Sequence, residues 1–186
     1  MTMEATGVIA TDAGMFCLWS PASFGDVVDY DTWESALLED DDIKRHITAG
    51  AFVPVNIYSD GAFRVLARVG SASATAGLTE RERRYLFVAS EPYLFVTAGG
   101  AKISGIEHVG AEPDDGLDVA LAPGRWSVTV ALIDWDAEPG QEDVGGRPAP
   151  TALPDFTLLI NPETSTGGYR TEVDTFDRRA LFPDVR

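Results

Sequence analysis

Short segments in which apolar and polar residues alternate run through most of this sequence, and they constrain its fold more than any other feature. Side chains at every second position share one face of a β-strand, so each segment predicts a strand with one buried face. The clearest segments span residues 53–57, 63–69, 117–121, 126–132 and 156–160. Apolar runs of similar length lie at residues 8–10, 15–19, 85–89, 93–97 and 102–106. We therefore predict a mainly β protein of about nine or ten short strands, an antiparallel β-sandwich or open barrel.

Two turn sequences predict how some of these strands connect. Asp60-Gly61 separates the first two alternating segments and predicts a β-hairpin, because Asp-Gly readily adopts the positive φ angles of a two-residue turn. Pro123-Gly124 lies between the segments 117–121 and 126–132 and predicts a second hairpin. Pro54 has no amide hydrogen to donate, so its strand is expected at a sheet edge or at a bulge.

Helical periodicity is concentrated in an insert over residues 31–49. A continuous helix there would place five apolar side chains on one face: Trp33, Ala36, Leu37, Ile43 and Ile47. Asp40 would then lie in the centre of that face, where an unpaired carboxylate is costly. We therefore predict a break at residues 40–42, with one of these aspartates capping a second short helix. Thr79 and Glu82 have the spacing of a capping box and predict one further helical turn.

The length of 186 residues fits a single domain. Residues 138–154 contain four Pro and three Gly, which predicts a long flexible connection. The tail over residues 162–186 is expected to be weakly structured, with a short helix at residues 173–181. The apolar runs are too short for a transmembrane helix. The N-terminus has no basic cluster typical of a secretory signal, which indicates a cytoplasmic protein.

Cys17 is the single cysteine, which excludes an internal disulfide and a cysteine-based zinc site. It lies in an apolar run, so we expect a buried and unreactive thiol. His46 and His108 are the two histidines, and neither belongs to a recognisable catalytic or zinc motif. We predict no enzymatic activity and no cofactor or metal. A hydrolase that uses paired carboxylates stays open as the weaker alternative.

The charge balance excludes some partners and favours others. The chain has 14 Lys and Arg against 30 Asp and Glu, a net charge of −16. Binding to nucleic acid or to an anionic membrane needs the opposite sign. A strongly negative protein associates fastest with a basic one, although solubility alone could also explain the charge.

More than half of the acids lie in three groups, each with an aromatic residue nearby. The groups are residues 26–42 (eight acids and no base), Glu112 with Asp114, Asp115 and Asp118, and a third from Asp134 to Asp143. Aromatic side chains ringed by charge are typical of protein interfaces. Trp33 and Trp126 lie on amphipathic faces and fit a core position, whereas Trp135 lies between two aspartates and is expected to be exposed. We predict that the partner is contacted by Asp40, Asp41, Asp42, Asp134, Trp135 and Asp136.

Parts of the sequence resemble a known family. Residues 85–133 contain two strands, a Gly-Ile turn region and the pattern Leu-x-Val-x-Leu-x-Pro-Gly-x-Trp-x-Val-x-Val, and they resemble the small acidic competence protein J family of nuclease inhibitors. Thr11-Asp12-Ala13-Gly14 and the segment 59–65 also look like uncharacterised all-β families found beside bacterial toxin genes. The resemblance implies an immunity protein or inhibitor, and it transfers no individual functional residue.

Together these observations predict a cytoplasmic acidic protein that neutralises a basic partner, of the nuclease-type toxin class, by blocking its active cleft. The main alternative is a β-sandwich module that binds a small ligand or packs into an assembly. The sequence does not specify the oligomeric state.

Overall fold

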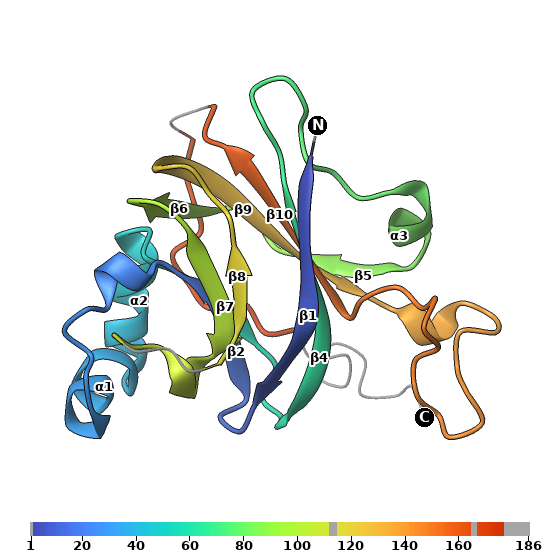
Figure 1. Ribbon diagram of the computed structural model, residues 1–186, viewed down its shortest axis with the longest axis horizontal. Coiled ribbons are helices and arrows are strands. Elements are labelled where there is room, and N and C mark those ends of the chain that lie inside the picture. The colour runs from blue at the N-terminus through green and yellow to red at the C-terminus, as the bar shows by residue number, and fades with distance from the viewer. Residues whose placement is uncertain (1, 112–114, 165–166, 177–186) are drawn as a thin grey trace.

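The computed structural model describes residues 2–111, 115–164 and 167–176 and places ten strands of this part of the chain in two sheets (Figure 1). The six-stranded sheet contains β1 (Met3–Thr11), β4 (Gly61–Val69), β10 (Phe156–Pro162), β9 (Gly124–Ile133), β5 (Leu86–Ala89) and β6 (Tyr93–Thr97). The four-stranded sheet has the order β3 (Phe52–Asn56), β2 (Met15–Trp19), β7 (Ala101–Gly105) and β8 (Leu117–Val119). The described strands do not close into a barrel, so the predicted β fold takes the sandwich form.

The six-stranded sheet has the order β1-β4-β10-β9, and β9 pairs on its outer side with both β5 and β6. These two strands follow one another along β9, with the break between them at Ser90-Glu91-Pro92. The pairing of β10 with β4 is parallel, and the other pairings are antiparallel. Apolar side chains from both sheets form one core, whose largest fully buried members include Phe16, Trp19, Phe52, Tyr93, Phe95 and Phe156. Their burial is the main favourable contribution to folding.

Neither of the predicted hairpins forms. β3 pairs with β2, whereas β4 pairs with β1 and β10 in the other sheet, so residues 57–60 cross between the sheets. The positive φ in this crossing is at Tyr58, at 51°, and not in the Asp60-Gly61 pair. β8 and β9 likewise lie in different sheets. Alternation predicts which face of a strand is buried. Because both sheets have an apolar face, alternation does not predict which strand is the hydrogen-bonded neighbour. The edge position predicted from Pro54 is confirmed, because β3 is an edge strand.

The predicted insert forms two helices, α1 (Tyr30–Leu37) and α2 (Asp40–Thr48). The break is at residues 38–39, and the predicted capping role of an aspartate is wrong, because the N-cap residue of α2 is Glu39 and its side chain makes no capping hydrogen bond. Asp40, Asp41 and Asp42 instead occupy the first turn, where carboxylates interact favourably with the helix dipole. The capping box of Thr79 and Glu82 is confirmed at the start of α3 (Glu80–Arg84).

Three short 3₁₀ segments complete the described elements: η1 (Pro21–Ser23), η2 (Ile106–His108) and η3 (Trp135–Ala137). Cys17 is fully buried, as expected. The helix expected from residue 173 is not present over residues 173–176, where Thr175 forms a bridge to Asn56, and residues 177–181 lie outside the described part. Flexibility of residues 138–154 stays a prediction, and so does the weakly structured tail. None of the helices in the described residues is long and apolar enough to cross a membrane.

Candidate protein-interaction surface

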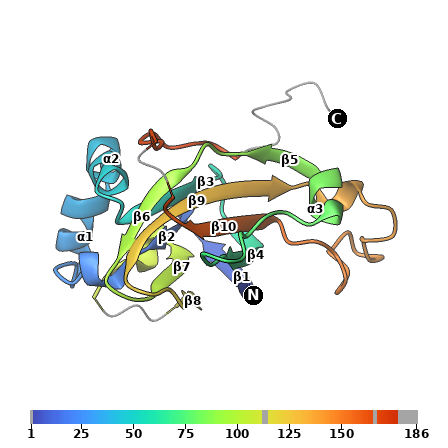
Figure 2. The same ribbon diagram turned by 90° about the horizontal axis from the view of Figure 1, so that it is seen from above.

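The two sets of predicted contact residues lie at opposite ends of the molecule. Asp40, Asp41 and Asp42 begin α2, next to α1, at one end of the sandwich. Asp134, Trp135 and Asp136 follow β9 at the other end, near α3 (Figures 1 and 2). The sandwich separates the two sets, so they do not form one continuous surface.

Trp135 is less exposed than the sequence suggested. Its indole Nε1 donates a hydrogen bond of 2.8 Å to the Asp155 carboxylate, and its ring packs against a small apolar cluster that includes Ile133 and Leu153. The neighbouring acid Glu138 pairs with Arg81 at 2.6 Å. At this end of the molecule, Trp135 and Glu138 therefore make contacts within the protein itself. Partner contact by Asp134, Trp135 and Asp136 stays a prediction.

The acids of residues 26–42 are more accessible to solvent than Trp135 and Glu138 at the other end. Seven of the eight carboxylates are exposed, and the eighth, Asp42, is partly buried and pairs with Arg45 at 2.7 Å. In the second acidic group, Asp118 pairs with Lys102 at 3.0 Å, while Glu112 and Asp114 lie outside the described residues. The largest set of exposed acids in the described chain is therefore on and around the two helices.

Exposed apolar side chains gather at the same end. The described residues include eight large hydrophobic side chains that are exposed, and four of these line two grooves beside α1: Val28, Tyr30, Leu38 and Tyr58. Tyr30 is 67% exposed and Tyr58 is 75% exposed. We call these four residues, the exposed acids of residues 26–42 and the two grooves the helical-end surface. Large apolar side chains that gather on an exposed face are a common mark of an interaction site.

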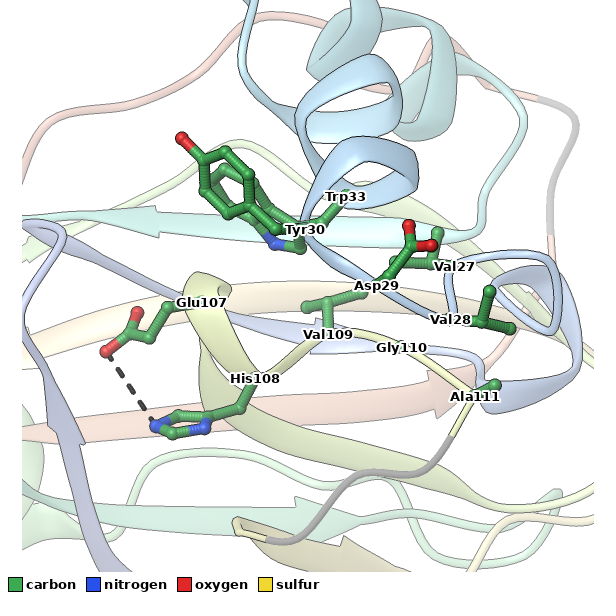
Figure 3. A pocket seen from close by; sticks show the side chains of 10 residues that line it. All are labelled: Val27, Val28, Asp29, Tyr30, Trp33, Glu107, His108, Val109, Gly110 and Ala111. Carbon is green, nitrogen blue, oxygen red and sulfur yellow. Dashed lines mark ion pairs between the residues drawn. The ribbon is translucent and has the colours of Figure 1, made fainter.

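The first groove lies between the start of α1 and the segment 107–111, and its volume is about 600 Å³ (Figure 3). Its lining includes Val28, Asp29, Tyr30, Trp33, Glu107 and His108. Figure 3 shows the Tyr30 and Trp33 rings together on one side of the groove and the Glu107–His108 pair on the other. The two ring centroids are 6.1 Å apart, and their planes differ by 22°, so the rings are stacked.

Hydrogen bonds fix the polar and aromatic groups of the first groove. Trp33 Nε1 donates to the carbonyl of Ile106 at 2.8 Å, which sets the orientation of the indole. One Glu107 oxygen accepts from Thr11 Oγ1 at 3.0 Å, and the other accepts from the backbone amide of Asp12 at 2.8 Å. Both the aromatic and the anionic wall are therefore positioned before any partner arrives.

Asp29 adds a second carboxylate to this groove. Its side chain caps α1, and hydrogen bonds from the hydroxyl and amide of Thr32 lower the pKa of Asp29 below its ordinary value. Asp29 is therefore ionised at neutral pH.

The second groove lies beside α1 and α2 and has a volume of about 570 Å³. Trp33 lines both grooves. The second groove also contains the exposed side chains of Leu38, Tyr58 and two of the predicted contact residues, Asp40 and Asp41. Its lysine, Lys44, forms an ion pair with Glu172. The structure thus places Asp40 and Asp41 beside exposed apolar groups that the sequence did not single out.

His46 and Asp174, two titratable side chains outside the helical-end surface, have local partners within the fold. No group of three or more His, Cys, Asp or Glu side chains in the described part of the chain is arranged to hold a metal ion. His46 Nε2 donates a hydrogen bond of 3.1 Å to the Ala36 carbonyl, its ring packs against Phe24, and burial lowers the pKa of its imidazole. Burial also raises the pKa of Asp174, but this carboxylate forms an ion pair with Arg170 at 2.5 Å.

Comparison with known proteins identifies the fold. No family model and no curated protein match the chain. A solved structure described as crocagin biosynthetic gene J superposes with a TM-score of 0.60 at 16% sequence identity. ComJ from Bacillus subtilis, described as an inhibitor of the DNA-degrading activity of NucA, superposes with a TM-score of 0.51 at 11% identity. Each alignment covers 88% of this chain and 99% of the other.

The chain shares the fold of ComJ. The resemblance to the competence protein J family seen in residues 85–133 is therefore confirmed as a similarity of fold. At this level of identity the similarity does not transfer residues, so the helical-end surface has to be argued from the present structure.

The sequence missed several members of this surface. Trp33 was expected in the core because it lies on the apolar face of α1, and it is in fact only partly buried between two grooves. Tyr58 directly follows the predicted strand 53–57 and was not singled out, and it lies in the crossing between the sheets. The one available signal was the presence of Tyr30 and Trp33 inside the longest acidic segment.

Proposed function

We propose that the protein binds a more basic protein and inhibits it by covering its active cleft, as a nuclease inhibitor or immunity protein does. The observation that carries this proposal is the helical-end surface, where four exposed apolar side chains lie among seven exposed carboxylates. Apolar groups of this kind supply buried area in an interface, and the surrounding charges steer the encounter. The protein itself acts as a binding partner and not as an enzyme.

The fold and the net charge support a nuclease as the partner. ComJ, which shares this fold, inhibits a DNA-degrading nuclease. A nuclease cleft binds phosphate through Lys and Arg, and an acidic protein surface can occupy the same groups. The net charge of −16 favours fast association with such a partner and disfavours direct binding to nucleic acid or anionic membranes. A cytoplasmic location and a toxin as the nuclease are parts of the same proposal.

One observation favours a second candidate function. The volume of the first groove, about 600 Å³, is within the range of small-molecule sites, so a β-sandwich module that binds a ligand is the alternative. Two carboxylates line this groove, which disfavours a neutral apolar ligand.

Inhibition of purified basic nucleases tests the proposal. The chain is added to a panel of such enzymes, including NucA, and DNA degradation and complex formation are measured at increasing salt. We expect the chain to inhibit at least one enzyme of the panel at stoichiometric concentration, and we expect association to slow as salt rises. No complex at micromolar concentration with any member of the panel would contradict the proposal.

A pair of matched variants then identifies the contact end. Asp40→Lys with Asp41→Lys and Asp134→Lys with Asp136→Lys change the net charge equally at opposite ends of the molecule. We expect the first double variant to slow association about tenfold and to flatten its salt dependence, because charges close to an interface dominate steering. The reverse result would assign the interface to the η3 end.

A further inference from the structure

We infer that the first groove receives one arginine side chain of the basic partner, held between the Tyr30–Trp33 pair and the carboxylate of Glu107. This inference rests on the proposed function and specifies one contact within it. The groove has the three properties that an arginine site needs: unbalanced negative charge, an aromatic face and acceptors that are already in position.

The charge of the groove is not balanced from within. Asp29 and Glu107 are its two acids, and its lining includes neither Lys nor Arg. The basic side chain in this lining is the imidazole of His108, whose Nε2 lies 4.0 Å from Glu107. Figure 3 shows the two carboxylates on different sides of the groove, so a cation bound at Glu107 gains a second negative charge near it, which the capping hydrogen bonds of Asp29 hold ionised.

Glu107 is oriented for a planar donor. Thr11 and Asp12 each donate to a different oxygen of its carboxylate, so the plane of the group is fixed. An ionised carboxylate has about four acceptor positions, and two remain for a partner. A guanidinium donates two parallel N–H groups to such a carboxylate, whereas an ammonium behaves as a point charge.

The aromatic wall favours the same group. Tyr30 is 67% exposed and is stacked on Trp33, whose indole is fixed by its hydrogen bond to Ile106. A guanidinium stacks on an aromatic face through cation–π attraction, and a ring that is already fixed loses little entropy on binding. An apolar occupant would remove water from the Glu107 carboxylate without supplying a donor in its place, and an anion would be repelled.

The test uses a free arginine derivative and needs no partner protein. N-acetyl-arginine amide is titrated into the ¹⁵N-labelled chain to about 50 mM, because a single side chain is expected to bind with a dissociation constant in the millimolar range. We expect saturable shifts of the Trp33 indole N–H signal and of the His108 ring. The citrulline derivative, which has the same shape without the charge, should bind at least tenfold more weakly, and the lysine derivative should be intermediate.

Variants locate the site. Glu107→Gln should weaken arginine binding about tenfold, while Glu142→Gln makes the same charge change in the loop after η3 and should leave binding unchanged. Because Glu107 also holds Thr11 and Asp12, Tyr30→Leu is the second variant: it alters an exposed side chain, keeps the apolar area and removes the ring. Tyr30→Leu should weaken binding several-fold with the fold intact.

Three results would overturn the inference: no saturable shift, equal binding of arginine and citrulline, or unchanged binding in both Glu107→Gln and Tyr30→Leu. Failure here with inhibition of a nuclease intact leaves the proposed function in place and removes only the arginine contact. If the groove binds arginine but the chain inhibits no nuclease, the arginine site stands and the proposed function falls, so the two proposals are tested separately.

Discussion

Replacing Glu82 by glutamine tests the ion pair that attaches α3 to the six-stranded sheet. Glu82 is 2% exposed, and its carboxylate accepts hydrogen bonds from Arg68 Nη1 at 2.9 Å and Nη2 at 3.1 Å. It also accepts from the backbone amide of Thr79 at 2.6 Å, which closes the capping box of α3. Arg68 lies in β4 and is 8% exposed, so both charges are withdrawn from water.

The structure sets the size of the expected effect. Removing one charge of a buried pair typically costs about 3–5 kcal/mol, because the other charge stays buried without its partner. Arg68 keeps two other acceptors in the Glu82→Gln variant, the Glu4 carboxylate at 2.6 Å and the Gly77 carbonyl at 2.8 Å. We therefore expect the lower end of the range, about 3 kcal/mol, which corresponds to a fall in Tm of about 6–12 °C for a domain of this size.

Urea and thermal unfolding of a double-mutant cycle provide the measurement. Glu82→Gln and Arg68→Met should each destabilise the protein, and the double variant should cost less than the sum by at least about 1.5 kcal/mol. Glu172→Gln, which removes the exposed partner of the exposed Lys44, is the control and should lower the Tm far less. Additive costs, or a fall of less than about 2 °C in Glu82→Gln, would refute the reasoning.

Three further predictions concern pH, the thiol and a glycine. Burial alone would raise the pKa of Glu82, but the hydrogen bonds from Arg68 and Thr79 outweigh it and hold the pKa below the ordinary 4.5. The stability that Glu82 contributes is therefore full above pH 4.5 and is lost as the pH falls through the lower pKa of the folded state. The unfolding curves of wild type and Glu82→Gln should converge on acidification. Burial and then the charge of Glu107 raise the pKa of the Cys17 thiol, so a thiol reagent at pH 8 should label it only as fast as the protein unfolds, and rapid labelling of folded protein would contradict this. In Gly70→Ala the new Cβ would lie 2.2 Å from Asn161 Oδ1 and 2.7 Å from the Ala76 amide nitrogen. We expect the free energy of unfolding in urea to fall by about 1–3 kcal/mol. An unchanged unfolding midpoint would show that this turn adjusts freely.

Local chemistry explains what the sequence could predict. The capping box of Thr79 and Glu82 involves residues three apart, and the buried faces of the strands follow from alternation within each strand. The missing amide hydrogen of Pro54 limited β3 to a sheet edge or a bulge, and the structure has it at an edge. Each of these features depends on a few neighbouring residues, so a single sequence contains the information.

Strand partners could not be predicted in the same way. The Asp60-Gly61 pair suits a hairpin, yet all five residues of β3 are buried, because one face meets the other sheet and α2 packs against the strand. A hairpin of β3 with β4 would place both strands in one sheet and would remove β4 from its pairing with β1 and β10. The choice is decided by contacts between distant residues, and no short motif records it.

The candidate site was predicted only in part, for a related reason. The acidic segment 26–42 was visible in the sequence, but the exposure of Tyr30 and the groove beside Glu107 depend on how α1 meets residues 106–111. Charge density alone gave equal weight to Asp134 and Asp136, which the sandwich places at the opposite end. A charged cluster becomes a candidate interface when apolar groups lie beside it, and that arrangement is a property of the fold.

The position of the helices in the chain strengthens the case for a binding role. β2 and β3 are antiparallel neighbours, and a short turn would be enough to connect them. Residues 20–51 connect them instead, and they contain α1, α2 and the longest acidic segment of the chain. The insert is tied to the core by Leu37, Ile43 and Ile47, which are buried, while its outer face presents Tyr30 and the carboxylates to solvent. Because the connection itself requires none of this outer face, its composition is free to match a partner, and substitutions there should change binding more than stability.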